Sequence, residues 1–184
     1  MRAEFLAFLV LLLALGVQRL NELRRSRINE ESLRARGGFE VHPEHYPVMV
    51  ALHASWFAAM LLEAHFRGGP LDLGTYWPVL GALALGFGLR RYSMSVLGDR
   101  WSTRIFIVPG EPPIRRGLYR YIRHPNYLGV VLELAAVPLL YQAWGTAVIW
   151  SIANLFLLRH RIRLEEQALS SYQAPASAAR SEPY

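Results

Sequence analysis

The side chains best suited to chemistry lie in residues 115–129, where arginines, tyrosines and one histidine directly precede an apolar stretch. Guanidinium groups, phenols and an imidazole supply positive charge, hydrogen-bond donors and ring faces that attract cations. Pro125, directly after His124, interrupts regular backbone structure. The combination predicts a site at a membrane edge that holds a polar cofactor beside a lipophilic substrate.

A second polar segment, residues 159–166, follows the last apolar stretch. If this segment is helical, Arg161 and Glu165 are i,i+4 neighbours, and His160 lies on an adjacent face. A surface ion pair is one interpretation of this pattern. The functional interpretation is favoured because a short turn between the last two apolar stretches returns this segment to the side that carries residues 115–129.

Five apolar stretches must position these segments: residues 5–17, 46–62, 77–89, 127–141 and 144–158. Hydrophobic residues make up 53% of the 184-residue chain and form blocks without the polar stripe of a soluble amphipathic helix. Each block is shorter than the roughly 20 residues of a spanning helix, but flanking Arg, Tyr and Trp side chains extend a span. We therefore predict an all-α integral membrane protein with about five transmembrane helices; a soluble helical bundle is the alternative.

Positive charge is concentrated on one side of this topology. All twenty cationic residues are arginines, and eighteen lie in residues 19–36, 90–123 or 159–180. Because cytoplasmic loops retain positive charge, the N-terminus is predicted outside and the C-terminus in the cytoplasm, as in a bacterial inner membrane. Anionic membrane lipids account for the formal net charge of +6, so nucleic acid is not expected as a partner.

The chain is expected to form a single domain over residues 1–172, followed by a disordered Ala-, Ser- and Pro-rich tail at 173–184. Residues 20–36 are predicted to continue the first helix, which ends at a Gly-Gly pair, and the two prolines in 39–47 predict a loop. The alternating run at 105–107 favours extended backbone. No glycine-rich nucleotide-binding motif occurs, so no Rossmann domain is expected.

Two ionisable side chains, His53 and Glu133, lie within the predicted spans. Such groups are costly in a bilayer and normally face the bundle interior or a watery cavity, so both are candidates for substrate contact. For His53 a structural hydrogen bond is an equal alternative.

A loop cluster of His42, Glu44 and His45 resembles a set of metal ligands. A histidine pair in a loop without further ligands is more typical of a surface or pocket feature, so no metal is expected. The chain contains no cysteine, which excludes disulfides and thiolate chemistry.

The C-terminal half resembles the isoprenylcysteine carboxyl methyltransferase family. The residues that carry the resemblance are Leu97-Gly98-x-x-Trp101, Gly117-Leu118-Tyr119-Arg120-Tyr121-x-Arg123-His124-Pro125-Asn126-Tyr127-x-Gly129 and Arg161-x-x-x-Glu165-Glu166-x-x-Leu169. The resemblance implies a multi-helix membrane fold in which cytoplasmic segments enclose S-adenosylmethionine and a lipophilic substrate enters from the bilayer. The family usually continues with Phe-Gly-x-x-Tyr, where this chain has Leu169-Ser170-Ser171-Tyr172.

The resemblance also implies roles for individual residues. Cofactor contact is implied for Tyr119, His124, Pro125, Tyr127, Leu128, Gly129 and Glu165. A role at the reacting centre is implied for Arg161 and Glu165, and Trp101 joins His53 and Glu133 as a candidate for substrate contact.

The N-terminal half carries Gly37-Gly38-Phe39-Glu40 and His45-Tyr46-Pro47, with His53 and Glu63. Through these residues it resembles a bacterial branch of the family, found beside type III polyketide synthases, that methylates hydroxyls of long-chain alkylpyrones or alkylresorcinols. The expected activity is therefore S-adenosylmethionine-dependent O-methylation of a long-chain phenol or pyrone hydroxyl, or of a prenylcysteine-like carboxylate. Membrane sterol reductases carry a similar Arg-His-Pro-x-Tyr-x-Gly element, so an NADPH-dependent reductase is the alternative, and a non-catalytic membrane scaffold is a third interpretation.

Overall fold

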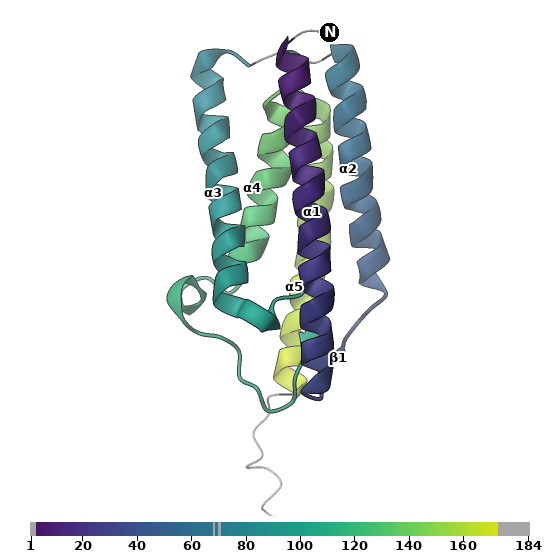
Figure 1. Ribbon diagram of the computed structural model, residues 1–184, viewed down its shortest axis with the longest axis vertical. Helices are drawn as coiled ribbons and strands as arrows, with labels where there is room; N and C mark the ends of the chain where they lie inside the picture. Colours follow the sequence, from purple (N-terminus) through teal and green to yellow (C-terminus); the bar gives the residue numbers. More distant parts are fainter. Residues whose placement is uncertain (1–2, 68, 70, 173–184) are drawn as a thin grey trace, which may run out of the picture.

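The computed structural model describes residues 3–67, 69 and 71–172. Within these residues, five α-helices run along one long axis, and a two-stranded ribbon lies at one end (Figure 1). The helices are α1 (Ala3–Ala35), α2 (His45–Arg67), α3 (Leu73–Leu97), α4 (Pro125–Leu139) and α5 (Trp144–Tyr172). The predicted helical architecture is confirmed here, and the described residues contain no Rossmann-like sheet. The tail predicted at 173–184 lies outside them.

Helix α1 joins the first apolar stretch to the charged segment that follows it. It ends at Ala35, and the Gly38 N–H donates to the Leu33 carbonyl at 2.9 Å, which satisfies one carbonyl of the last turn. The predicted continuation of the first helix to the Gly-Gly pair is confirmed. As a result α1 reaches from the top of the bundle in Figure 1 to the end that carries the ribbon.

The segment predicted as a loop at 39–47 is partly ordered. Strand β1 (Phe39–Glu40) pairs antiparallel with β2 (Phe106–Ile107). The extended backbone predicted at 105–107 is therefore confirmed, whereas its pairing with β1 was not predicted. Helix α2 already begins at His45, and Pro47 lies in its first turn, where a missing N–H costs no helical hydrogen bond. The loop prediction was therefore wrong for residues 45–47.

Helices α3 and α4 pack backbone to backbone. A Cβ atom on Gly129 would lie 2.8 Å from the Gly86 carbonyl oxygen, and one on Gly86 would lie 3.0 Å from the Gly129 oxygen. Small residues permit such close approach between helices. This contact fixes the start of α4, which carries the His124–Tyr127 signature, against α3.

The upper half of the bundle holds an apolar core that includes Phe8, Leu12, Leu15, Trp56, Met60, Leu134, Val137 and Tyr141. Pro138 in α4 has no N–H to donate to the Leu134 carbonyl. The Trp56 indole N–H from α2 donates to that carbonyl at 3.3 Å instead. The carbonyl group that Pro138 leaves without its helical partner is thereby hydrogen-bonded from a neighbouring helix.

The outward faces of the helices are apolar as well. Exposed side chains include Leu6, Val10, Leu13, Leu62, Phe66, Trp77, Leu85, Val148, Ile149, Ile152 and Phe156. By length and hydropathy, two described segments are able to cross a membrane, Glu4–Ala35 and His45–Phe66. These measures therefore support two of the five predicted spans.

Candidate functional site

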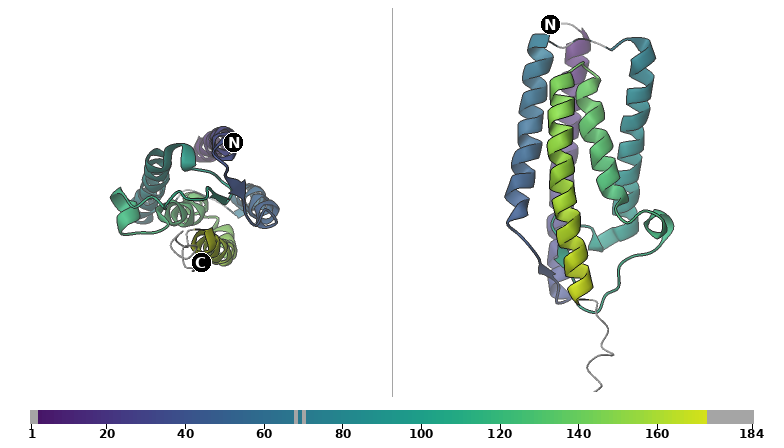
Figure 2. Two further views of the ribbon diagram at one scale, coloured as in Figure 1. Left: turned by 90° about the horizontal axis from the view of Figure 1, so that it is seen from below. Right: turned by 180° about the vertical axis from the view of Figure 1, so that it is seen from behind.

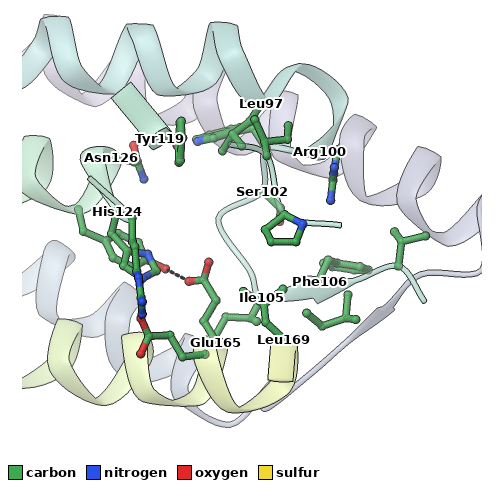
Figure 3. A pocket seen from close by; sticks show the side chains of 18 of the residues that line it. Leu97, Arg100, Ser102, Ile105, Phe106, Tyr119, His124, Asn126, Glu165 and Leu169 are labelled. Atoms are coloured by element: carbon green, nitrogen blue, oxygen red, sulfur yellow. Dashed lines mark hydrogen bonds and ion pairs between the residues drawn. The ribbon is translucent and has the colours of Figure 1, made fainter. Parts of the chain in front are cut away.

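A cavity of about 650 Å³ lies at the end of the bundle that carries the ribbon, next to the start of α4. Its walls come from the ends of α1, α3 and α5, from the start of α4, from β2, and from the segment that connects α3 to α4 (Figure 3). The polar lining includes Tyr119, His124, Asn126, Tyr127, Arg161, Glu165 and Glu166, and the apolar lining includes Leu33, Leu97, Trp101, Ile105, Ile107 and Ile114.

The connection from α3 to α4 is shaped by two 3₁₀ turns, η1 (Gly98–Arg100) and η2 (Gly117–Arg120). Gly117 has a φ of 56°, and a Cβ atom there would overlap the Tyr92 hydroxyl. That hydroxyl accepts a hydrogen bond from the Leu118 N–H at 2.9 Å. Tyr92 thus anchors η2 to α3, which holds Tyr119 at the cavity wall.

The His-Pro pair sets the start of α4. Pro125 occupies the first turn, and His124 before it has non-helical dihedrals, so the predicted break is confirmed. The His124 ring stacks on the Tyr127 ring, with centroids 5.1 Å apart and planes 6° apart. The two rings form one wall of the cavity (Figure 3).

The Tyr127 hydroxyl joins α4 to two residues of α5. It donates to Glu165 Oε2 at 2.6 Å, the contact dashed in Figure 3, and accepts from Arg161 Nε at 2.9 Å. The Arg161 guanidinium also contacts Met49 Sδ at 2.8 Å and donates to the Thr103 carbonyl. Arg161 is only 4% exposed, so the surface ion-pair interpretation is wrong. Arg161 and Glu165 are coupled through a tyrosine inside the molecule.

The neighbouring Glu166 lies at the cavity rim. Arg123 donates to its carboxylate at 3.1 Å, and His124 Nε2 lies 3.6 Å from the same oxygen. The hydrogen bond from Arg123 lowers the pKa of the Glu166 carboxyl, so this carboxylate is charged at neutral pH. Burial raises the pKa of the Tyr119 phenol, which therefore stays protonated and able to donate.

Three buried polar atoms in the cavity wall form no hydrogen bond with the protein, and one of them, His124 Nε2, lies 3.6 Å from Glu166. Trp101 Nε1 is a donor without an acceptor, and Asn126 Oδ1 is an acceptor without a donor. Burying such groups unpaired costs free energy, so they favour a ligand that pairs with them. Asn126 is a site residue that sequence reasoning missed, although it stands inside the His-Pro-Asn-Tyr element that indicated the site.

The structure brings together six of the residues predicted from sequence: Trp101, Tyr119, His124, Tyr127, Arg161 and Glu165. Three others do not line the cavity. Pro125 is buried at the start of α4, Leu128 is 42% exposed, and Gly129 lies against α3. The segment that departs from the family pattern still contributes, because Leu169 (Figure 3) and Ser170 line the cavity.

The predicted substrate contacts His53 and Glu133 lie away from this cavity. His53 Nδ1 donates to the Met49 carbonyl of its own helix at 2.8 Å. Glu133 is 1% exposed and pairs with Arg19 of α1 and Arg90 of α3. His42 contacts Glu44, and the His42 carbonyl oxygen accepts from His45, the first residue of α2, but within the described residues no three His, Asp or Glu side chains are placed to share a metal ion.

The sequence model of the isoprenylcysteine carboxyl methyltransferase (ICMT) family matches residues 79–171, which include every polar residue of the cavity wall named above. The chain belongs to this family. The resemblance drawn from the sequence motifs is thereby confirmed, and family membership makes the chain a methyltransferase relative. These matches give no support to the reductase alternative.

The relatives of this ICMT-family chain include bacterial proteins. It is 36% identical to the uncharacterised protein YpbQ of Bacillus subtilis over 90% of its own length and 98% of that protein. An uncharacterised protein of Haemophilus influenzae is 29% identical over 77% of this chain and 83% of the relative. No solved structure matches the chain significantly.

Proposed function

We propose that this protein is an integral-membrane O-methyltransferase that transfers a methyl group from S-adenosylmethionine to a lipophilic acceptor. One observation carries the proposal. In a chain of a methyltransferase family, Tyr127 couples Arg161 to Glu165 at the wall of a cavity whose other walls hold unpaired polar atoms. The proposed acceptor is a long-chain phenol or pyrone hydroxyl, or a prenylcysteine-like carboxylate.

The donor set of the cavity fits S-adenosylmethionine. The cofactor carries a sulfonium and an ammonium group, a carboxylate and an adenine ring. The Glu165 carboxylate and the stacked rings of His124 and Tyr127 suit the cations, since ring faces and anions both attract positive charge. Trp101 Nε1 and Asn126 Oδ1 offer one donor and one acceptor to the adenine edge or to the amino acid portion. The bound cofactor supplies an activated methyl group.

The work of the chain is to position the acceptor oxygen and exclude water, because methyl transfer is an in-line displacement. The bonds that hold Arg161 to Tyr127 and to the Thr103 carbonyl fix the direction of its guanidinium group. A carboxylate acceptor needs only this orienting cation. A hydroxyl acceptor must also lose a proton, and we assign this role to Glu165 or His124 at the cavity wall, since Glu166 is paired with Arg123 at the rim. His160 is exposed and does not line the cavity, so it is not proposed as the base.

The membrane topology belongs to the same proposal. Apolar side chains cover the outside of the bundle, and the arginine-rich segments gather at the end that carries the cavity. Because positive charge is retained on the cytoplasmic side, we place the cavity in the cytoplasm, the N-terminus outside and five spans between them. An acceptor dissolved in the bilayer then reaches the site between helices.

The test is transfer of labelled methyl from S-adenosylmethionine to long-chain resorcinols, pyrones and a prenylcysteine analogue by the detergent-purified protein. Wild-type protein should methylate at least one acceptor, and Arg161→Lys should not, because an ammonium group cannot reproduce the planar contact. The matched control is Arg163→Lys, which alters an exposed arginine of the same helix and should keep activity. Reduction of a lipid substrate with NADPH, and no methyl transfer, would refute the proposal.

A further inference from the structure

A second set of unpaired polar groups lies on α5, outside the cavity lining. Asn154 is 1% exposed, and neither its carbonyl oxygen nor its amide nitrogen has a hydrogen-bond partner. The hydroxyl of Ser151, one turn earlier, is also buried and unpaired. An amide left without partners in an apolar environment costs about 1–3 kcal/mol by protein mutational data. A ligand group that forms hydrogen bonds with this amide would offset the cost.

Asn154 lies on the face of α5 that carries the reacting centre. Seven residues, close to two full turns, separate it from Arg161, so both side chains leave the same side of the helix. The rise along the helix places their Cα atoms about 10 Å apart. Leu158, between them, is buried as well, so this face points into the bundle.

Contacts with α2 give the level of Asn154 in the bundle. At one end Glu63 accepts from the Gly145 N–H at 2.8 Å, and at the other Met49 contacts Arg161. The two helices are antiparallel neighbours over this length (Figure 2). Because both helices rise equally per residue, counting from the two contacts places Asn154 level with residues 54–56 of α2, and His53 lies between it and Arg161. The apolar core at this level contains Trp56 and Leu134, which offer the amide no partner, since the Trp56 indole is already bonded to Leu134.

We propose that Asn154, together with Ser151, binds a second, uncharged oxygen of the methyl acceptor, while the oxygen to be methylated lies at Arg161. This inference rests on the proposed function. An amide both donates and accepts, so it matches a hydroxyl or a carbonyl group. The charged side chains near this level, Glu133 with Arg19 and Arg90, are already paired with one another, so a charged ligand group would find no free counter-ion and an uncharged group is favoured. The acceptor class is an amphiphile with two oxygens on a small ring or short spacer, joined to a long chain.

The experiment uses two probes that differ by one oxygen, pentadecylresorcinol and pentadecylphenol. Their apparent dissociation constants are measured by tryptophan fluorescence in nanodiscs, with and without S-adenosylhomocysteine. Wild-type protein should bind the resorcinol about tenfold more tightly, the effect of one neutral hydrogen bond. In Asn154→Leu the preference should disappear, and Ser151→Ala should reduce it. The control Ile152→Leu, on the exposed face of the same helix, should retain it.

Stability and cofactor binding separate the possible outcomes. Asn154→Leu should unfold at the same temperature as wild type or higher, because an unpaired buried amide is removed. If Asn154→Leu does not fold, Asn154→Ala provides the same comparison. Equal probe preference in wild type and variant, or no preference in wild type, would overturn the inference and leave Asn154 to a buried water. Absence of S-adenosylhomocysteine binding in wild type would instead refute the proposed function.

Discussion

Helix α4 contributes one residue to each of two polar clusters, Glu133 to the upper cluster and Tyr127 to the lower one. The two clusters differ in how their members are paired. In the upper cluster, Glu133 and Glu22 share Arg19 and Arg90, so two acids and two bases neutralise one another across α1, α3 and α4. Arg90 Nε and Glu133 Oε1 form no hydrogen bond, but they lie 3.3 Å apart as an ion pair. Six residues earlier, Tyr127 faces a cavity whose wall leaves Trp101 and Asn126 with unpaired atoms.

This difference in pairing distinguishes a cluster that stabilises the fold from a cluster that binds a ligand. Charges that satisfy one another stabilise a helix arrangement and leave nothing for a ligand to bind. Polar groups that remain unpaired around a cavity destabilise the folded protein when no ligand is bound. They therefore indicate where a ligand forms the missing hydrogen bonds. We therefore interpret the Glu133 cluster as structural and the Tyr127 cluster as the binding site. The variants that follow test this contrast.

The largest expected effect is on stability. Glu133→Gln leaves the buried Arg90 and the half-buried Arg19 facing one carboxylate, and breaking a buried ion pair by removing one partner costs about 3–5 kcal/mol. The free energy of unfolding in detergent should fall by this amount, while the folded fraction binds S-adenosylhomocysteine as wild type does. Unchanged stability with a raised KM for the acceptor would restore the substrate contact that the sequence predicted for Glu133.

The second effect is on catalysis. Glu165→Gln keeps the shape of the side chain but removes the charge beside Tyr127, and we expect kcat/KM for methyl transfer to fall at least ~100-fold, which corresponds to about 2.7 kcal/mol. The free energy of unfolding should change by less than about 1 kcal/mol. Turnover like that of wild type would remove Glu165 from the reacting centre.

A smaller effect is expected at the ring stack. His124→Ala removes the ring that stacks on Tyr127, and aromatic pairs contribute about 0.5–1.5 kcal/mol beyond their burial. The affinity for S-adenosylhomocysteine should therefore fall roughly 2–10-fold, as measured by calorimetry. Wild-type affinity in this variant would place the cofactor away from the stack.

The smallest effect is expected at Glu166, the matched control for Glu165. Its pKa is lowered in the folded protein, so its contribution to stability is present above the ordinary carboxyl pKa and is lost as pH falls through the lowered value. Glu166→Gln should remove this acid-side loss of stability and keep most of the turnover at neutral pH. A loss of turnover as large as that of Glu165→Gln would mean that the two neighbouring acids are not distinct in function.

The sequence predicted the helices well because apolar blocks are local signals. It placed α4 and α5 within two residues at their starts and located the turn between them. The extensions of α1 and α5 into charged segments follow from residues that favour helix. Strand β1 was missed, because residues 39–40 carry no local strand pattern and pair with β2 residues that are 66 and 68 positions away in the sequence.

The site was predicted in part. His124, Tyr127 and Glu165 were found through their motifs, whereas the unpaired state of Asn126 depends on which side chains fold around it. The pairing of Glu133 with Arg19 joins residues 114 apart, so the sequence showed a costly buried acid without its partner. Local patterns identify the groups that need an explanation, and only the packed bundle shows whether the protein itself provides it.

The most direct test of the account is equilibrium binding to the detergent-purified wild-type protein, with S-adenosylhomocysteine and NADPH compared by calorimetry. We expect the wild-type protein to bind one S-adenosylhomocysteine per chain and no NADPH. The affinity for S-adenosylhomocysteine should be weaker in His124→Ala, and the folded fraction of Glu133→Gln should bind it with wild-type affinity. Binding of NADPH without S-adenosylhomocysteine, or S-adenosylhomocysteine binding that is lost in Glu133→Gln and unchanged in His124→Ala, would contradict the assignment of the cavity.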